Sequence, residues 1–184
     1  MATQSFTYKP LATLSEIRVL QVSPSLDSNA EISATFETES LAPTASPKFD
    51  ALSYMWGDQT QRASISIDGA PFSVSRHLAS TLCTLRDSKR PRRLWVDAIC
   101  INQADSHERN QQVQLMKTVY QRADAVLIWL NQQVDASNSA IQKLWTIDTT
   151  SSIADLGDTP AFWKPLVDVF DDPYWGRVWI QQEI

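Results

Sequence analysis

Two apolar segments separated by a helical pattern constrain the fold of this chain of 184 residues most strongly. Leu94–Val96 and Ala125–Leu130 consist of apolar residues throughout. A strand that is apolar on both faces is buried on both faces, which is typical of a parallel sheet covered by helices. Between the two segments, a pattern with apolar residues on one face begins at Asp105 and runs to about Arg122. The order strand, helix, strand predicts a right-handed βαβ unit and therefore an α/β fold.

The residues before position 77 predict strands. Ile17–Val22 and Glu31–Phe36 alternate apolar and polar side chains, as half-buried strands do. Ser64–Ile67 and Phe72–Val74 flank Asp68-Gly69, a pair that supplies the positive φ angles of a two-residue hairpin turn. The N-terminal part is therefore expected to be rich in β-structure.

From residue 77 onward the period becomes helical. His77–Asp87 carries leucines at helical spacing, and the pattern Asp105-Ser-His-Glu108 predicts a capping box in which Glu108 reaches back to the cap residue. We expect a β-rich extension over residues 1–48 and a core domain over residues 49–184. The last residues continue a helical pattern with no stop signal, so the domain is expected to be truncated at its C-terminus.

Composition and charge exclude several classes of protein. Only four glycines are present, and they cannot form a phosphate-binding loop or a dinucleotide-binding turn. The net charge is −5, and the single basic cluster, Lys89–Arg93, is expected to be a solvated loop, so nucleic-acid binding is not predicted. No apolar run is long enough to span a membrane. Two cysteines without a disulfide framework predict a cytoplasmic protein, and His77 and His107 have no metal-ligand spacing, so no metal site is expected.

Three segments concentrate residues that a hydrophobic core does not need. They are Ala51–Asp58, Leu94–Asp105 and Tyr174–Glu183. In open α/β sheets, ligands bind beyond the carboxyl ends of the strands. The polar residues expected just past such ends are Asp58, Asp97, Asn102 and Gln103.

The same three segments resemble the heterokaryon incompatibility (HET) domain of filamentous fungi. The residues that carry the resemblance are Ala51-Leu-Ser-Tyr-Met-Trp-Gly57, Leu94-Trp-Val-Asp-Ala-Ile-Cys-Ile-Asn-Gln103, Glu108-Arg-Asn-Gln-Gln-Val113, Met116, Tyr120, Ala123–Leu130 and Arg177-Val-Trp-Ile-Gln-Gln-Glu183. Asn131 departs from the pattern, because the family usually has glycine after Trp-Leu. The resemblance covers roughly residues 8 to 184.

The resemblance implies a module that triggers programmed cell death on non-self recognition, through self-association or binding to other incompatibility proteins. HET domains are distantly similar to TIR domains, so the expected fold is a TIR- or flavodoxin-like parallel sheet flanked by helices. Some TIR domains cleave NAD at the nicotinamide–ribose bond with a helical glutamate, and Glu183 in Trp179-Ile-Gln-Gln-Glu183 is similarly placed. Glu183 is thus the candidate catalytic carboxylate of an alternative function, with NAD as substrate and no cofactor.

The candidate substrate-binding residues follow from the same alternative. A cationic nicotinamide ring would lie over an aromatic face, and the phosphates would need N–H donors. The set of candidates is Tyr54, Trp56, Gly57, Asp58, Asp97, Asn102, Gln103, Arg109 and Trp179, with Arg177 as a further phosphate donor.

Each candidate also has a structural interpretation. Glutamates placed on a helix as Glu183 is are more often solvated surface carboxylates, and Asp97 is equally explained as a cap or as the partner of an arginine. Cys100 is best explained as a small buried apolar residue, and Trp95 and Trp129 as core residues. A small-molecule-binding α/β protein unrelated to cell death stays open as a third hypothesis.

Overall fold

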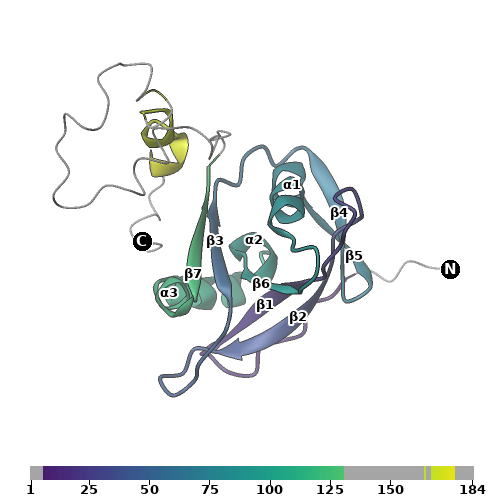
Figure 1. The fold of residues 1–184 in the computed structure, drawn as a ribbon. Coiled ribbons are helices and arrows are strands. Elements are labelled where there is room, and N and C mark those ends of the chain that lie inside the picture. The colour runs from purple at the N-terminus through teal and green to yellow at the C-terminus, as the bar shows by residue number, and fades with distance from the viewer. Residues whose placement is uncertain (1–5, 131–163, 165–166, 177–184) are drawn as a thin grey trace. The chain divides into compact units, whose positions relative to one another are not determined.

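The computed structural model describes residues 6–130, 164 and 167–176 (Figure 1). These residues fall into two compact units, one up to Trp129 and one from Leu130 onward. The first unit contains all the strands that are described and the three helices α1, α2 and α3. The candidates Trp179 and Glu183 and the possible donor Arg177 lie outside the described residues.

One mixed sheet of seven strands forms the first unit (Figure 1). The strand order across the sheet is β5-β4-β2-β1-β6-β3-β7. The strands are β1 (Glu16–Val22), β2 (Ser33–Ser40), β3 (Asp50–Tyr54), β4 (Arg62–Ile67), β5 (Ala70–Ser75), β6 (Arg92–Trp95) and β7 (Ala125–Trp129). The predicted α/β class is confirmed, because helices separate β5 from β6 and β6 from β7.

The direction of the strands divides the sheet. β6, β3 and β7 run parallel to one another, which confirms the parallel direction predicted for β6 and β7. The position of β3 between them was not part of that prediction. β1 lies between β2 and β6 and is antiparallel to both. The N-terminal strands therefore belong to the same sheet as the parallel strands, and the sheet of the described unit is mixed rather than wholly parallel.

The hairpin predicted at Asp68-Gly69 is present. β4 and β5 pair antiparallel, with Ile67 opposite Ala70, so only Asp68 and Gly69 lie in the turn. Both residues have positive φ, 51° and 79° respectively, as a type I′ turn requires.

Three helices accompany the sheet. α1 (Arg76–Leu85) begins at Ser75, whose hydroxyl accepts a hydrogen bond from the Leu78 N–H, and it packs on β4 and β5. α2 (Asp97–Cys100) is a single turn that follows β6 directly and contacts β1. α3 (Ser106–Arg122) is capped by Asp105 and buries Met116, Val119 and Tyr120, which the helical pattern had placed on its inner face.

Two expectations about the strands were wrong. Among the described strands β7 pairs only with β3, and Ile128 is 39% exposed, so β7 is a half-buried edge in this part of the chain. Trp129 is accordingly only partly buried, whereas Trp95 is fully buried as predicted. An apolar run alone cannot distinguish a central strand from an edge strand, because the distinction depends on which other strands pair with it.

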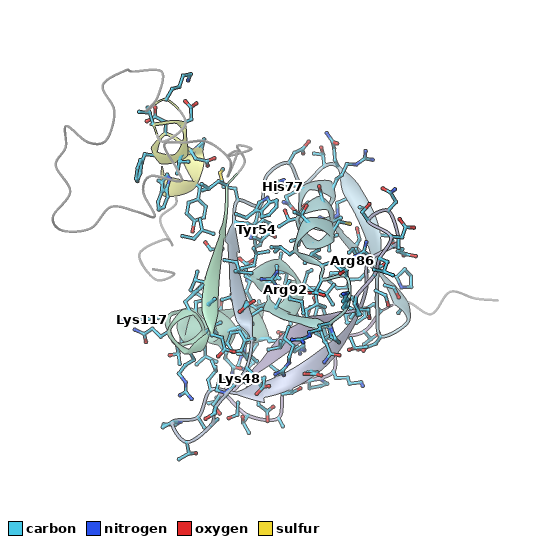
Figure 2. The ribbon with its side chains drawn as sticks, in the orientation of Figure 1. Lys48, Tyr54, His77, Arg86, Arg92 and Lys117 are labelled. Atoms are coloured by element: carbon cyan, nitrogen blue, oxygen red, sulfur yellow. The ribbon has the colours of Figure 1, made fainter. Side chains whose placement is uncertain are left out.

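The basic cluster Lys89–Arg93, which was predicted to be a solvated loop, lies only partly in a loop. Arg92 and Arg93 begin β6 and form ion pairs with carboxylates of other strands in the sheet. Arg92 pairs with Asp50 on the neighbouring β3 at 3.2 Å, and Arg93 pairs with Glu37 on β2, beyond β1, at 2.6 Å. Figure 2 shows Arg92 within the first unit. Cross-strand pairing therefore neutralises two of the charges that the sequence suggested were solvated.

In the second unit, residues 167–170 are helical and η2 (Pro173–Gly176) is a 3₁₀ turn. Asp172 accepts a hydrogen bond from the Tyr174 N–H and so caps the start of this turn. Trp175 donates its indole N–H to the carbonyl of Val169 at 2.7 Å. Across the described residues of both units, no helix is long and apolar enough to cross a membrane.

Candidate functional site

Two segments that follow neighbouring parallel strands meet at one end of the sheet. Trp56 follows β3 and Asp97 follows β6, and these strands are hydrogen-bonded neighbours. The indole N–H of Trp56 donates to a carboxylate oxygen of Asp97 at 3.0 Å. The carboxyl ends of β3 and β6 therefore bring together residues forty-one positions apart, as expected for an open α/β sheet.

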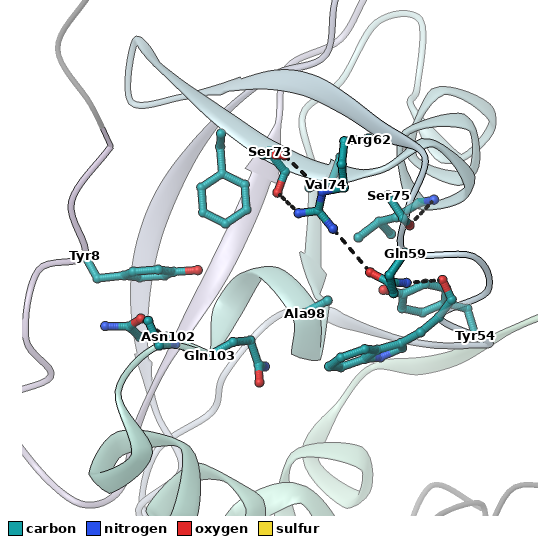
Figure 3. Close-up of a pocket in the computed structure, with 14 residues that line it drawn as sticks. Tyr8, Tyr54, Gln59, Arg62, Ser73, Val74, Ser75, Ala98, Asn102 and Gln103 are labelled. Carbon is teal, nitrogen blue, oxygen red and sulfur yellow. Dashed lines mark hydrogen bonds between the residues drawn. The ribbon is translucent and has the colours of Figure 1, made fainter.

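A pocket of about 330 Å³ lies at this end of the sheet (Figure 3). Four aromatic side chains line it: Tyr8, Tyr54, Trp56 and Phe72. Among its polar lining residues are Gln59, Arg62, Ser73, Asn102 and Gln103. Aromatic walls with a few convergent polar groups are typical of small-molecule sites.

The loop from Ile101 to Asp105 carries the amide side chains of this pocket. The Asn102 backbone N–H donates to a carboxylate oxygen of Glu108 at 2.8 Å, and the Gln103 side-chain amide donates to the carbonyl of Asp97 at 2.9 Å. The first bond holds the loop to α3 and the second holds it to α2. Together they orient the Asn102 and Gln103 side chains at the pocket wall.

Glu108 has a different role from the one predicted. Asp105 does cap α3, accepting from the N–H groups of His107 and Glu108. The Glu108 carboxylate does not complete the capping box. It binds the Asn102 N–H and the guanidinium of Arg18, because Arg18 on β1 offers a buried positive charge within 2.5 Å.

The buried pair of Arg18 and Glu108 thus stands directly behind the pocket loop. The Arg18 guanidinium donates twice to Glu108 and once to the Cys100 carbonyl, and it lies 4.9 Å from the ring centre of Tyr8. Burial opposes ionisation of Glu108, but the hydrogen bonds from Arg18 and Asn102 outweigh it and lower the pKa of this carboxyl. Burial raises the pKa of the Tyr8 hydroxyl, which donates to the Ile99 carbonyl at 2.9 Å.

This lowered pKa predicts how stability depends on pH. Because the pKa of Glu108 is lower in the folded protein than its ordinary value of 4.5, its ionised form stabilises the fold above that value. The contribution is lost as the pH falls from about 4.5 through the folded pKa. Urea titrations at several pH values should show a steeper fall in unfolding free energy for the natural chain than for Glu108→Gln. The same dependence of unfolding free energy on pH in both proteins would contradict the role given to Glu108. Glu31→Gln, at an exposed position, is the matched control.

The predicted site residues separate into three groups. Tyr54, Trp56, Asn102 and Gln103 line the pocket, and Asp97 is held behind Trp56. Gly57, Asp58 and Arg109 do not line it. Asp58 is exposed, and hydrogen bonds from the side chain and backbone of Thr60 lower the pKa of its carboxyl, whereas the Arg109 guanidinium donates to the Gln103 carbonyl at 3.4 Å. Trp179 and Glu183 lie outside the described residues.

Gly57 shapes the turn after Trp56. Its φ is +62°, and an added Cβ would lie 3.8 Å from the ring of His77, which is ordinary contact. Tyr54 stacks on the same His77 ring with 6.3 Å between ring centres (Figure 2). The turn therefore needs glycine for its backbone conformation and not for lack of space.

We expect Gly57→Ala to lower the free energy of unfolding by about 1–2 kcal/mol, because an L-residue is strained in this conformation. Gly176→Ala is the matched control, since Gly176 has no such φ and nothing lies within 4 Å of an added Cβ there. Urea denaturation of both variants measures the difference. Equal effects of the two substitutions would contradict the backbone explanation.

Sequence reasoning missed Tyr8, Gln59, Arg62 and Phe72 as pocket residues. Tyr8 lies ninety-one positions from the carbonyl it contacts, so no local pattern could reveal it. Gln59 and Arg62 immediately follow the Trp56-Gly57-Asp58 turn, and proximity to that motif was the only available signal. Cys100, by contrast, was correctly predicted to be buried, and burial raises the pKa of its thiol to about 12.

Potential metal ligands do not gather in this part of the chain. No group of three or more histidine, cysteine, aspartate or glutamate side chains among the described residues could hold a metal ion. The pocket chemistry available to the described residues is therefore ring stacking, hydrogen bonding by amides and the charge of Arg62.

Comparison with known proteins identifies the family. The model of the family "Heterokaryon incompatibility protein (HET)" matches residues 49–183. A curated relative, heterokaryon incompatibility protein 6, OR allele, of Neurospora crassa, is 35% identical over 142 residues, which cover 70% of this chain. The chain spans about 20% of the length of that relative. No solved structure matches the present chain. The family match covers all the core motifs that follow β3 and β6, so this chain belongs to the heterokaryon incompatibility (HET) family.

Proposed function

We propose that the chain acts in heterokaryon incompatibility, as a cytoplasmic module that triggers programmed cell death when incompatible fungal hyphae fuse. One observation supports this most strongly: the family motifs after β3 and after β6 place Trp56, Asn102 and Gln103 on the wall of one pocket. Motifs that served packing alone would not need an exposed indole and two half-buried amides there. The proposed partners are a second copy of the chain or another incompatibility protein, with neither nucleic acid nor a membrane involved.

The proposal is tested by inducing the full chain in a filamentous fungus and counting viable cells. Asn102→Ala removes a pocket amide, and we expect it to weaken killing about tenfold at equal protein level, as loss of one recognition hydrogen bond does. Asn29→Ala changes the same residue type in an exposed turn and should kill as the natural chain does. Equal killing by both variants, or no killing by the natural chain, would contradict the proposal.

A second candidate function is hydrolysis of NAD at the nicotinamide–ribose bond. The exposed indole of Trp56 beside the amides of Asn102 and Gln103 favours it, because a planar cationic ring can stack there. In this reaction the bond between the ribose C1′ and the nicotinamide nitrogen breaks, and nicotinamide leaves as a neutral molecule. Water forms the new C1′–O bond and releases one proton to solvent, giving ADP-ribose. The Glu183 carboxylate would stabilise the positive charge that develops on the ribose.

The test of this second function is NAD consumption by the purified full chain at high protein concentration. Glu183→Gln should abolish consumption, whereas Glu31→Gln, at an exposed position, should not change it. If the natural chain consumes no NAD, the enzymatic proposal fails while the cell-death proposal stands. If Glu183→Gln keeps full activity, the catalytic role of Glu183 is wrong.

A further inference from the structure

Arg62 is the single charged side chain among the described residues that line the pocket. Other arginines of the first unit bind carboxylates: Arg18 pairs with Glu108, Arg92 with Asp50 and Arg93 with Glu37. Arg62 has no carboxylate partner within the described part of the chain. Its positive charge therefore faces the pocket without a compensating negative charge from the lining.

Neutral oxygen atoms hold the Arg62 guanidinium in place (Figure 3). Its Nε donates to the Ser73 hydroxyl at 3.0 Å, one terminal nitrogen donates to the Ser73 carbonyl at 2.7 Å, and the other donates to the Gln59 side-chain oxygen at 3.3 Å. A guanidinium has five N–H donors, so one donor on each terminal nitrogen is left. Two such donors are what bidentate recognition of a phosphate or carboxylate requires.

The aromatic side of the pocket suits a flat ring. Trp56 is 40% exposed, and its hydrogen bond to Asp97 fixes the orientation of the indole. Stacking of a nucleic-acid base on such an aromatic face is favourable whatever the base, because every base has a flat π-face. A ring placed on Trp56 would therefore gain affinity without any rearrangement of the side chain.

The amides of the 101–105 loop complement the edge of such a ring. Gln103 uses its NH₂ group on the Asp97 carbonyl, which leaves its oxygen as an acceptor. Asn102 uses its oxygen on the Ala104 N–H, which leaves its NH₂ group as a donor. A donor and an acceptor on the same pocket wall are the groups that recognise the polar edge of a heteroaromatic base.

We propose that this pocket binds a nucleotide, with the ring on Trp56 and the phosphate on Arg62. A volume of about 330 Å³ is at the small end of the range for ligand sites, so it accommodates one nucleotide unit, alone or as one half of a dinucleotide. The inference rests on the proposed function, in which this pocket is the working site of the module. It adds Arg62, an anion-binding residue that the family motifs do not include, and the position of the phosphate in the pocket.

The test compares ligands that differ only in the phosphate. Binding of AMP and adenosine, and of nicotinamide mononucleotide and nicotinamide riboside, is measured by calorimetry on the full chain. We expect at least one phosphorylated compound to bind about tenfold or more tightly than its nucleoside, as charged hydrogen bonds imply. No binding by any of the four compounds, or equal binding within both pairs, would overturn the proposal.

The contribution of Arg62 is tested by substitution. Arg62→Gln should remove the preference for phosphate and leave nucleoside binding as in the natural chain, whereas Arg62→Lys should keep part of the preference. Arg90→Gln removes the same charge from an exposed loop and should change nothing. An unchanged preference in Arg62→Gln would overturn the assignment.

The killing assay separates the two proposals. If Asn102→Ala weakens killing while Arg62→Gln kills as the natural chain does, the phosphate inference fails and the cell-death proposal stands. If both variants kill normally, the cell-death proposal fails, because the pocket is then not needed for killing. Weakened killing by both supports both proposals.

Discussion

Arg18→Ala is expected to lower the free energy of unfolding by about 3–5 kcal/mol, because it leaves the Glu108 carboxylate buried without its partner. The two side chains are only 4% and 13% exposed. Arg18 also donates to the carbonyls of Cys100 and Lys9, so the substitution leaves those acceptors without this donor as well. Urea denaturation at neutral pH measures the loss.

An exposed ion pair provides the control for this prediction. Lys48 and Asp124 are 3.0 Å apart, but their side chains are 70% and 45% exposed. Lys48→Ala should therefore change the unfolding free energy by about 1 kcal/mol or less. A loss for Arg18→Ala as small as that for Lys48→Ala would show that the Arg18–Glu108 pair does not hold the pocket loop as described.

Trp95→Ala is expected to cost about 3–5 kcal/mol, because it opens a cavity in the centre of the first unit. Trp95 is fully buried and packs edge-on against Tyr120, with 5.6 Å between ring centres. Its indole nitrogen is buried and has no hydrogen-bond partner among the described residues. Trp95→Phe should therefore cost much less than Trp95→Ala, since most of the ring is kept and no hydrogen bond is lost.

Trp56→Ala is the matched comparison on the surface. Trp56 is 40% exposed, and we expect its removal to change the unfolding free energy by about 1 kcal/mol or less. Thermal and urea denaturation of the three tryptophan variants measure the order. If Trp56→Ala were as destabilising as Trp95→Ala, Trp56 would be a packing residue and not part of an open pocket.

Local patterns in the sequence predicted the elements well. Asp68-Gly69 specified the hairpin, and Asp105 specified the start of α3, because each depends on backbone geometry within a few residues. The parallel direction of β6 and β7 followed from their apolar character and the helix between them, but the position of β3 between these two strands did not. The hairpin turn and the start of α3 are determined by residues that are close together in the chain.

Features that depend on long-range pairing were not predictable. The insertion of β1 between β2 and β6, the bond from Arg18 to Glu108 and the position of Tyr8 in the pocket each join residues that are distant in sequence. Glu108 illustrates the reason. The spacing of Glu108 from Asp105 matches a capping box, but the buried guanidinium of Arg18, on strand β1, offers the Glu108 carboxylate a stronger interaction than the cap N–H does.

The most direct test of the central claim is a combined measurement of killing and stability for Trp56→Ala and Trp95→Phe. Both substitutions change a tryptophan within a family motif, but only Trp56 lines the pocket. We predict that Trp56→Ala folds with nearly natural stability and no longer kills, whereas Trp95→Phe kills as the natural chain does. Killing by a folded Trp56→Ala at the natural level would contradict the claim that this pocket is the working site of the HET module.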